Sequence, residues 1–229
     1  MASHDLLSGI AAPLPLENLD TDQIMPKQFL LGIDKAGLAR GVLYDLRMTP
    51  QGEPREDFVL NRHEYRGARI LIAGANFGCG SSREHAVWGL MQAGFDAVIA
   101  PSFGEIFYFN AQNNRLLLVT LPPADVARLN DIVSDPRHSL LTIDVQQQGV
   151  LTATGERFGF EMPARQKRMF VEGLDMIGMT LAERASIDAF EARHQARHPW
   201  MSIDLPAQQR AAPSTPSTPS TPSTPARSR

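Results

Sequence analysis

The middle of the chain alternates short apolar runs with segments whose apolar residues recur at helical spacing. The run at 68–73 leads into a glycine-rich stretch at 74–80, and apolar residues then return every three or four positions as far as Gly94. The same pattern repeats along the chain and predicts strands at 68–73, 97–100, 116–119 and 141–145, and helices at 83–94, 102–113 and 124–133. Because strands and helices alternate so closely, the pattern favours an α/β fold on a parallel sheet.

The pattern changes beyond residue 145. Two apolar segments at 150–153 and 157–160 are separated by Thr154-Gly155-Glu156, which is typical of a hairpin, and 182–193 has the spacing of a closing helix. A hairpin added to parallel strands makes the sheet mixed. We therefore expect an α/β domain with a mixed, mostly parallel sheet and flanking helices.

The end of the chain has a different composition. From about residue 207 it repeats Ser-Thr-Pro, with no large apolar side chain to bury and a proline that removes a backbone donor in each unit. The sequence therefore predicts two parts, a folded domain at 1–206 and a disordered tail at 207–229.

Composition excludes several classes of partner and site. A net charge of -3 gives no basic patch for nucleic acid, and no run of about 18 apolar residues is present to span a membrane. We expect a soluble, cytoplasmic protein with neither partner. The single cysteine, Cys79, cannot form an internal disulfide or a cysteine-built metal site, so we expect no metal or cofactor held by this chain alone.

The segment 74–86 concentrates the candidate chemistry. It joins a strand end, a glycine loop, Ser81, Ser82, Arg83 and a predicted helix start. Glycines let backbone N–H groups approach a ligand, a helix start adds partial positive charge, and a guanidinium binds a carboxylate through two parallel hydrogen bonds. These features predict an anion site.

Other interpretations of these residues remain open from the sequence alone. Ser81 and Glu84 fit a capping box, in which Ser81 only caps a helix, and Ser102 with Glu105 repeats that spacing. The loop lacks the Gly-Lys-Ser/Thr ending of a phosphate loop, which disfavours a nucleotide. Cys79 near His85 would suit a thiol nucleophile, but no orienting third residue is evident, and a histidine buried against backbone is the simpler interpretation of His85.

The same segment resembles a known family. Its run Asn76-Phe77-Gly78-Cys79-Gly80-Ser81-Ser82-Arg83-Glu84-His85-Ala86 is similar to the signature of the swivelling β/β/α domain of the aconitase superfamily, in the form found in isopropylmalate dehydratase small subunits. Three other blocks agree in order, at 18–30, 98–107 and 173–181. The resemblance covers about residues 5 to 200.

The resemblance implies a hydro-lyase that works in two subunits. It implies a large subunit that carries a four-iron, four-sulfur cluster, a small dicarboxylate substrate, and interconversion of 2-isopropylmalate and 3-isopropylmalate through 2-isopropylmaleate in leucine biosynthesis. In this chain Ser81 would be the base. Arg83, Ser82 and Asp22 would bind the substrate.

One departure from the family leaves the substrate open. Where relatives carry an arginine-containing loop after residue 30, this chain has Gly32-Ile33-Asp34-Lys35-Ala36-Gly37, and Lys35 is the candidate replacement for the arginine. Alternatives are therefore the same chemistry on a related 2-hydroxy diacid, such as a citramalate or a dimethylmalate, or a non-catalytic anion-binding regulatory subunit. A second departure, at 163–168, is expected on the surface at a helix start.

Overall fold

The computed structural model describes residues 5–30 and 36–201. The chain divides into two units, Met1–Ala182 and Glu183–Arg229. The first unit contains the sheet, and the second contains α8 (Arg184–Arg197) and the turn η6 (Pro199–Met201). The boundary predicted at 206 and the tail at 207–229 lie outside the described residues, as does Lys35.

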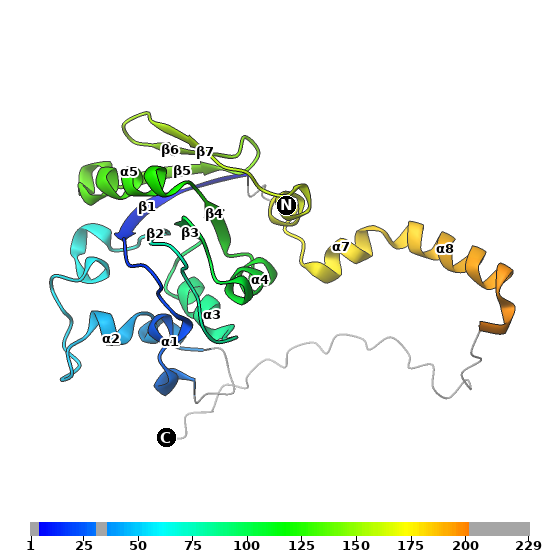
Figure 1. Ribbon diagram of the computed structural model, residues 1–229, viewed down its shortest axis with the longest axis horizontal. Helices are drawn as coiled ribbons and strands as arrows, with labels where there is room; N and C mark the ends of the chain where they lie inside the picture. The colour runs from blue at the N-terminus through cyan, green and yellow to red at the C-terminus, as the bar shows by residue number, and fades with distance from the viewer. Residues whose placement is uncertain (1–4, 31–35, 202–229) are drawn as a thin grey trace, which may run out of the picture. The chain divides into compact units, whose positions relative to one another are not determined.

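The first unit is built on a seven-stranded mixed sheet in the order β4-β3-β2-β1-β5-β6-β7 (Figure 1). Its strands are β1 (Leu6–Leu14), β2 (Ile70–Ala73), β3 (Ala97–Ala100), β4 (Leu117–Thr120), β5 (Leu140–Asp144), β6 (Gly149–Thr152) and β7 (Arg157–Gly159). The strands β1 to β4 are parallel neighbours, whereas β5, β6 and β7 are joined to β1 and to one another in antiparallel fashion. The predicted mixed α/β sheet and its hairpin are confirmed.

The central strand, β1, was not predicted. It pairs with β2 on one side, with Ala11 opposite Ile70, and with β5 on the other, with Leu7 opposite Ile143. Glycine and proline, here Gly9 and Pro13, are usually depleted in strands, which disguises the segment. Pairing on both sides and close packing override that propensity.

Helices cover both faces of the sheet. They are α3 (His85–Gln92), α4 (Glu105–Asn114) and α5 (Pro123–Ser134), close to the predicted bounds. Successive β2 side chains alternate between two cores: Leu71 packs with residues of α3 and α4, whereas Ile70 and Ile72 pack with residues of α5. Figure 1 shows α5 on the opposite side of the sheet from α3 and α4.

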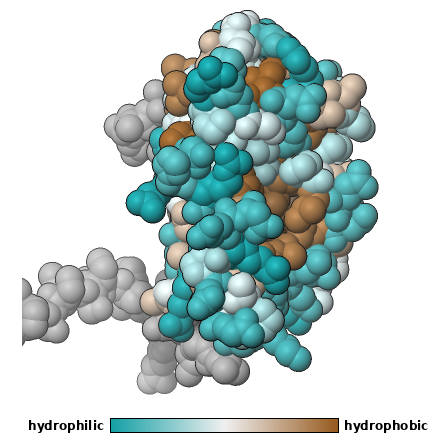
Figure 2. Space-filling view, turned by 90° about the vertical axis from the view of Figure 1, so that its left-hand side faces the viewer, coloured by the Kyte–Doolittle hydropathy of each residue, from teal (hydrophilic) through white to brown (hydrophobic). Residues whose placement is uncertain are grey.

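Short turns fill the long connection between β1 and β2. They are α1 (Thr21–Ile24), η1 (Lys27–Phe29), η2 (Leu38–Gly41), α2 (Tyr44–Arg47), η3 (Val59–Asn61) and η4 (His63–Tyr65). They add Ile24, Met25, Val42 and Leu43 to the core shared with α3. Figure 2 faces the side of the molecule where α2 and α5 lie and shows apolar side chains surrounded by hydrophilic ones.

After the hairpin the first unit ends in two helices, α6 (Ala164–Val171) and α7 (Met176–Ala182). The basic segment at 163–168 lies at the start of α6, where Pro163 precedes the first turn, as predicted. Within the described residues, no helix combines the length and apolar character needed to span a bilayer.

Candidate functional site

Three loops meet where β1, β2 and β3 end. Because these strands are parallel, their carboxyl ends share one edge of the sheet, the place where open α/β sheets usually bind ligands. The backbone N–H of Gly78 donates to Leu19 O at 2.7 Å, and that of Thr21 donates to Cys79 O at 2.9 Å. The N–H of Phe77 donates to Ser102 O at 3.1 Å, which ties in the third loop.

Glycine is required at two points where these loops touch. Gly78 has a φ of 75°, and a Cβ there would lie 2.3 Å from the ring of Phe107. A Cβ on Gly104 would lie 2.4 Å from Gly78 O. Any side chain at either position would push the loops apart, so these glycines fix the backbone that carries Ser81.

The structure brings Asp22 and Arg83 together as an ion pair. Asp22 lies in α1, which begins with a full capping box: the Asp20 side chain accepts from Gln23 N at 2.7 Å, and Asp20 N donates to the Gln23 side chain at 3.0 Å. Arg83 is the more buried partner, with 28% of its side chain exposed against 52% for Asp22. The pair therefore joins the β1 loop to the β2 loop by charge.

Ser81 lies beside the same pair. The side-chain hydroxyl of Thr21 donates to Ser81 O at 3.0 Å, and Arg83 N donates to that oxygen at 2.8 Å. Ser81 and Ser82 are both exposed. Four of the five predicted site residues, Asp22, Ser81, Ser82 and Arg83, thus occupy one place, and the fifth, Lys35, lies outside the described residues.

Thr21 is the neighbour that sequence reasoning missed. It is buried, with 1% exposure, and its hydroxyl reaches the backbone of the residue predicted to be the base. Its place between the two aspartates of the Asp20-Thr21-Asp22 turn was the available signal, but a threonine there does not by itself indicate a contact 60 residues away.

Neither Ser81 nor Ser102 forms the helix cap that the Ser-x-x-Glu spacing allows. The helix α3 begins at His85 with Glu84 as its cap residue and no side-chain cap bond, and α4 begins after Gly104, also without one. The Ser102 hydroxyl instead accepts from Asn76 N at 2.9 Å. The helix α3 begins three residues later than it would with Ser81 as its cap, so the Ser81 side chain does not cap this helix.

Cys79 and His85 have separate partners. The thiol of Cys79 donates to Asn18 O at 3.5 Å, whereas the ring of His85 packs edge-on against Trp88 with centroids 4.8 Å apart. His85 is half-buried, and its described contact is aromatic rather than a bond to backbone. This arrangement gives no support to a thiol nucleophile. Among the described residues, no three His, Cys, Asp or Glu side chains are placed to hold a metal ion.

Comparison with known proteins identifies the family. The profile of the aconitase C-terminal domain matches residues 1–124, and the profile of the C-terminal domain of 3-isopropylmalate dehydratase small subunits matches residues 176–204. A 3-isopropylmalate dehydratase small subunit 1 from Chromobacterium violaceum is 62% identical over 88% of this chain and 94% of its own length. A 3-isopropylmalate dehydratase small subunit from Phenylobacterium zucineum is 47% identical over 88% and 98%.

A solved structure agrees with these relatives. The crystal structure of a 3-isopropylmalate dehydratase from Methanocaldococcus jannaschii is 26% identical, with a TM-score of 0.58 over 81% of this chain and 99% of that one. The resemblance inferred from the 76–86 loop is therefore confirmed. By sequence and by fold, the chain belongs to the family of 3-isopropylmalate dehydratase small subunits, within the aconitase superfamily.

Proposed function

We propose that this chain is the small subunit of a hydro-lyase that isomerises 2-isopropylmalate to 3-isopropylmalate through 2-isopropylmaleate in leucine biosynthesis. The names of its relatives support the activity and imply a large-subunit partner. The structural observation that supports the proposed residues is that Ser81 lies beside the Asp22–Arg83 ion pair at the carboxyl edge of the sheet. In this proposal the chain contributes one part of the active site, and the large subunit contributes the other.

Ser81 is the proposed base. It is exposed in a loop whose backbone is held on both sides, so its hydroxyl is available to a substrate. A serine hydroxyl is a weak base in water, and its alkoxide needs N–H donors and positive charge around it. The glycine loop and Arg83 supply them. In the dehydration step Ser81 Oγ takes the proton from the carbon next to a substrate carboxylate.

Arg83 is the proposed carboxylate clamp, with Ser82 as an exposed hydroxyl beside it. A guanidinium presents parallel N–H donors that match a carboxylate, which an ammonium does not. Asp22 pairs with Arg83 and thereby aims it. We propose that the large subunit carries a four-iron, four-sulfur cluster, which would supply Lewis-acid activation of the leaving hydroxyl.

The substrate is the finer part of the proposal. The relatives are named for isopropylmalate, which favours that substrate over a citramalate or a dimethylmalate. Lys35 remains a proposed selectivity residue in a segment that the structure does not describe. Its ammonium would take the place of the arginine found in relatives.

The test is turnover by the reconstituted complex. The full chain is combined with the large subunit and its cluster, and 2-isopropylmaleate is followed as it forms from 3-isopropylmalate. Ser81→Ala should lower kcat by several orders of magnitude, whereas Ser134→Ala, an exposed serine in α5, should leave it unchanged. Both variants should bind the large subunit equally. Near-normal turnover by Ser81→Ala in an intact complex would contradict the assigned base.

A further inference from the structure

A hollow of 430 Å³ lies between η2, α2, the turns η3 and η4, and the end of α3. No described residue of its lining belongs to the 74–86 loop. This volume falls within the range of about 300 to 1,000 Å³ that is usual for small-molecule sites. Its polar lining consists of Arg40, Arg47, Arg62, Arg66, Asn61 and Gln92, and none of its described lining residues carries a carboxylate. We call it the arginine hollow.

Three of these arginines, Arg40, Arg47 and Arg66, form no ion pair with any acidic side chain in the described part of the chain. Other arginines are neutralised locally, as Arg128 is by Glu156 at 2.7 Å. Several uncompensated charges around one concave surface focus a positive potential inside it, which draws in anions.

Arg47 is held rigidly in the wall. Its Nε donates to Asn61 Oδ1 and its Nη1 donates to Val42 O, both at 3.3 Å. The Asn61 amide nitrogen in turn donates to Arg47 O at 2.7 Å and to Arg55 O at 2.8 Å. Burial lowers the pKa of Arg47, because partial removal of solvent disfavours its charged form. A fixed cation spares a ligand the cost of ordering it.

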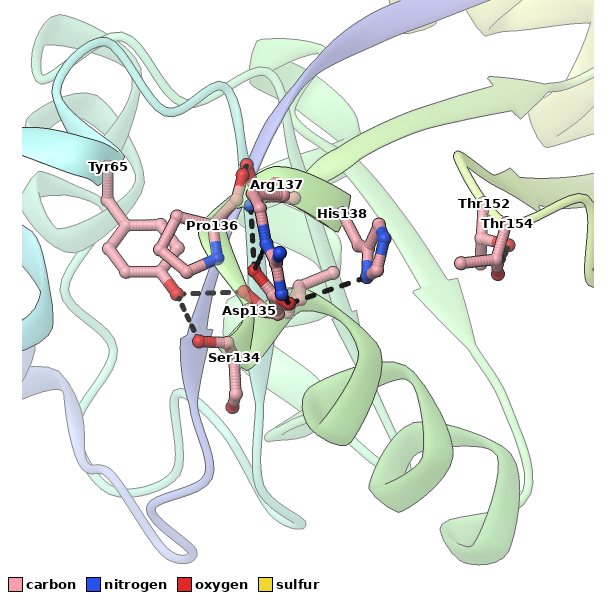
Figure 3. A network of polar contacts seen from close by, with 10 residues as sticks. Tyr65, Ser134, Asp135, Pro136, Arg137, His138, Thr152 and Thr154 are labelled. Atoms are coloured by element: carbon pink, nitrogen blue, oxygen red, sulfur yellow. Dashed lines mark hydrogen bonds and ion pairs between the residues drawn. The ribbon is translucent and has the colours of Figure 1, made fainter.

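A second wall is anchored to α5. The Tyr65 hydroxyl donates to Val133 O at 2.8 Å and to Ser134 O at 3.2 Å, at the carboxyl end of that helix (Figure 3). The guanidinium of Arg62 lies over the Tyr65 ring, 5.4 Å from its centroid, and pairs with Glu64 at 3.3 Å. Arg62 is therefore positioned by a buried ring, and the hollow is preformed on both sides.

The remaining lining is apolar. Its partly exposed apolar residues are Ala39, Leu60 and Ala93, so the hollow also presents hydrocarbon surface to a ligand. We propose that the arginine hollow binds a small organic anion that carries two or more carboxylate or phosphate groups on a compact apolar skeleton. The anionic groups contact Arg40, Arg47 and Arg66, and the skeleton packs on the apolar lining.

The experiment is calorimetric titration of the full chain at constant ionic strength, alone and in complex with the large subunit. Citrate probes for carboxylates, pyrophosphate probes for phosphates, and acetate is the singly charged control. At least one multivalent probe should saturate a single site, and acetate should not. Whichever of citrate and pyrophosphate binds more tightly identifies the class of anion, carboxylate or phosphate.

Variants assign the binding to the hollow. Arg40 and Arg66 are exposed, so Arg40→Gln and Arg66→Gln test charge with little risk to folding, which thermal unfolding checks first. Each variant should lower the affinity for the tighter-binding probe by about tenfold, since each removes a charge-assisted hydrogen bond. Arg165→Gln, an exposed arginine on α6 outside the hollow, is the matched control and should change affinity less than twofold.

Three results would overturn the proposal: no saturable binding of either multivalent probe, equal weakening by Arg165→Gln, or loss of the site when the large subunit binds. The last would show that the partner covers the hollow. If one of the two hollow variants fails to fold, the other decides the question in the same assay.

Discussion

The side-chain amide of Asn76 donates a hydrogen bond of 2.9 Å to the side-chain oxygen of Asn18, and both residues have left-handed backbone, with φ of 58° and 55°. Asn18 follows β1 and Asn76 follows β2, so this bond joins the two loops that carry Asp22 and Ser81. Asparagine tolerates the left-handed region better than most residues. The two residues therefore combine a required backbone shape with a direct link.

Two substitutions of Asn76 separate the effect of its left-handed backbone from that of its hydrogen bond to Asn18. Asn76→Gly keeps the left-handed backbone and loses the bond, whereas Asn76→Ala loses the bond and adds strain of about 1 kcal/mol or more. The unfolding temperature should be highest for wild type, lower for Asn76→Gly and lowest for Asn76→Ala. Both variants should lower kcat by roughly tenfold or more in the complex, because the loop with Ser81 shifts.

Gln148→Gly is the matched control for this prediction. Gln148 also has a positive φ, of 48°, and donates to Met162 O at 3.0 Å, far along the chain from the site loops. Gln148→Gly should lower the unfolding temperature about as much as Asn76→Gly does, and it should leave kcat unchanged. If Asn76→Gly behaves like this control, the Asn18–Asn76 bond has no bearing on catalysis.

The Asp22–Arg83 pair predicts two different kinetic effects. Arg83→Lys keeps the charge but loses the parallel donors, so KM should rise roughly tenfold to a hundredfold. Asp22→Asn leaves Arg83 intact but without its anionic partner, so KM should rise less and kcat should change little. Steady-state kinetics of the complex measures both. A larger effect of Asp22→Asn than of Arg83→Lys would show that Asp22 contacts substrate directly.

Asp135 gives a prediction about pH. Hydrogen bonds from the Arg137 side chain and backbone N–H lower the pKa of Asp135 to about 2 (Figure 3). Because the folded-state pKa is depressed, the carboxylate stabilises the fold above its unfolded pKa near 4, and that contribution disappears as pH falls toward 2. Asp135→Asn should therefore unfold at a lower temperature than wild type at pH 7, with the gap closing between pH 4 and 2.

Arg137→Gln is the reciprocal test, since it removes the guanidinium donors and leaves the carboxylate and the backbone N–H bond. The double variant should be no less stable than either single variant if the two side chains act as a pair. A wild-type advantage that persists unchanged at pH 2 would assign the stabilisation to something other than the Asp135 charge.

Lys35 predicts a change in substrate preference. One methylene of fit in an apolar pocket is worth about 1 to 3 kcal/mol, so the segment at 31–37 can redirect selectivity without altering Ser81 or Arg83. Lys35→Ala should change the ratio of kcat/KM values for isopropylmalate, citramalate and dimethylmalate. Equal losses for all three, or none, would place Lys35 outside the selectivity determinant.

The strength of the sequence signal differed between the elements of the fold. The elements from β2 to β7 were predictable because apolar residues alternate there with glycine and polar breaks at regular intervals. The strand β1 was not, since Gly9 and Pro13 argue against a strand until the pairing on both its edges is known. The short turns between Thr21 and Tyr65 were also missed, because each is too short to establish a period.

The candidate site also combines residues that a local pattern reveals with residues that only the tertiary structure brings together. Ser81 and Arg83 were identifiable from one continuous loop, but Asp22 was reached only through family resemblance. It meets Arg83 because β1 lies beside β2, a relationship between segments that local spacing does not contain. The Ser-x-x-Glu spacing failed for a related reason: it records only sequence distance, whereas in the fold α3 begins at His85, beyond a loop in which Gly78 and Gly80 have positive φ.

The place of β1 at the centre of the sheet determines the order in which the molecule can be completed. The units from β2 to β4 pair through short crossovers and can form as soon as those residues leave the ribosome. The strand β1 is made first, yet its partner β5 is synthesised long afterwards, so closing that pair is a slow, long-range step. Asp22 follows β1 directly, and it reaches Arg83 only after β1 has docked beside β2. The Asp22–Arg83 pair is therefore assembled by the docking of β1 beside β2 rather than by local folding, and a chain trapped before β1 docks has Ser81 in its loop but lacks this pair.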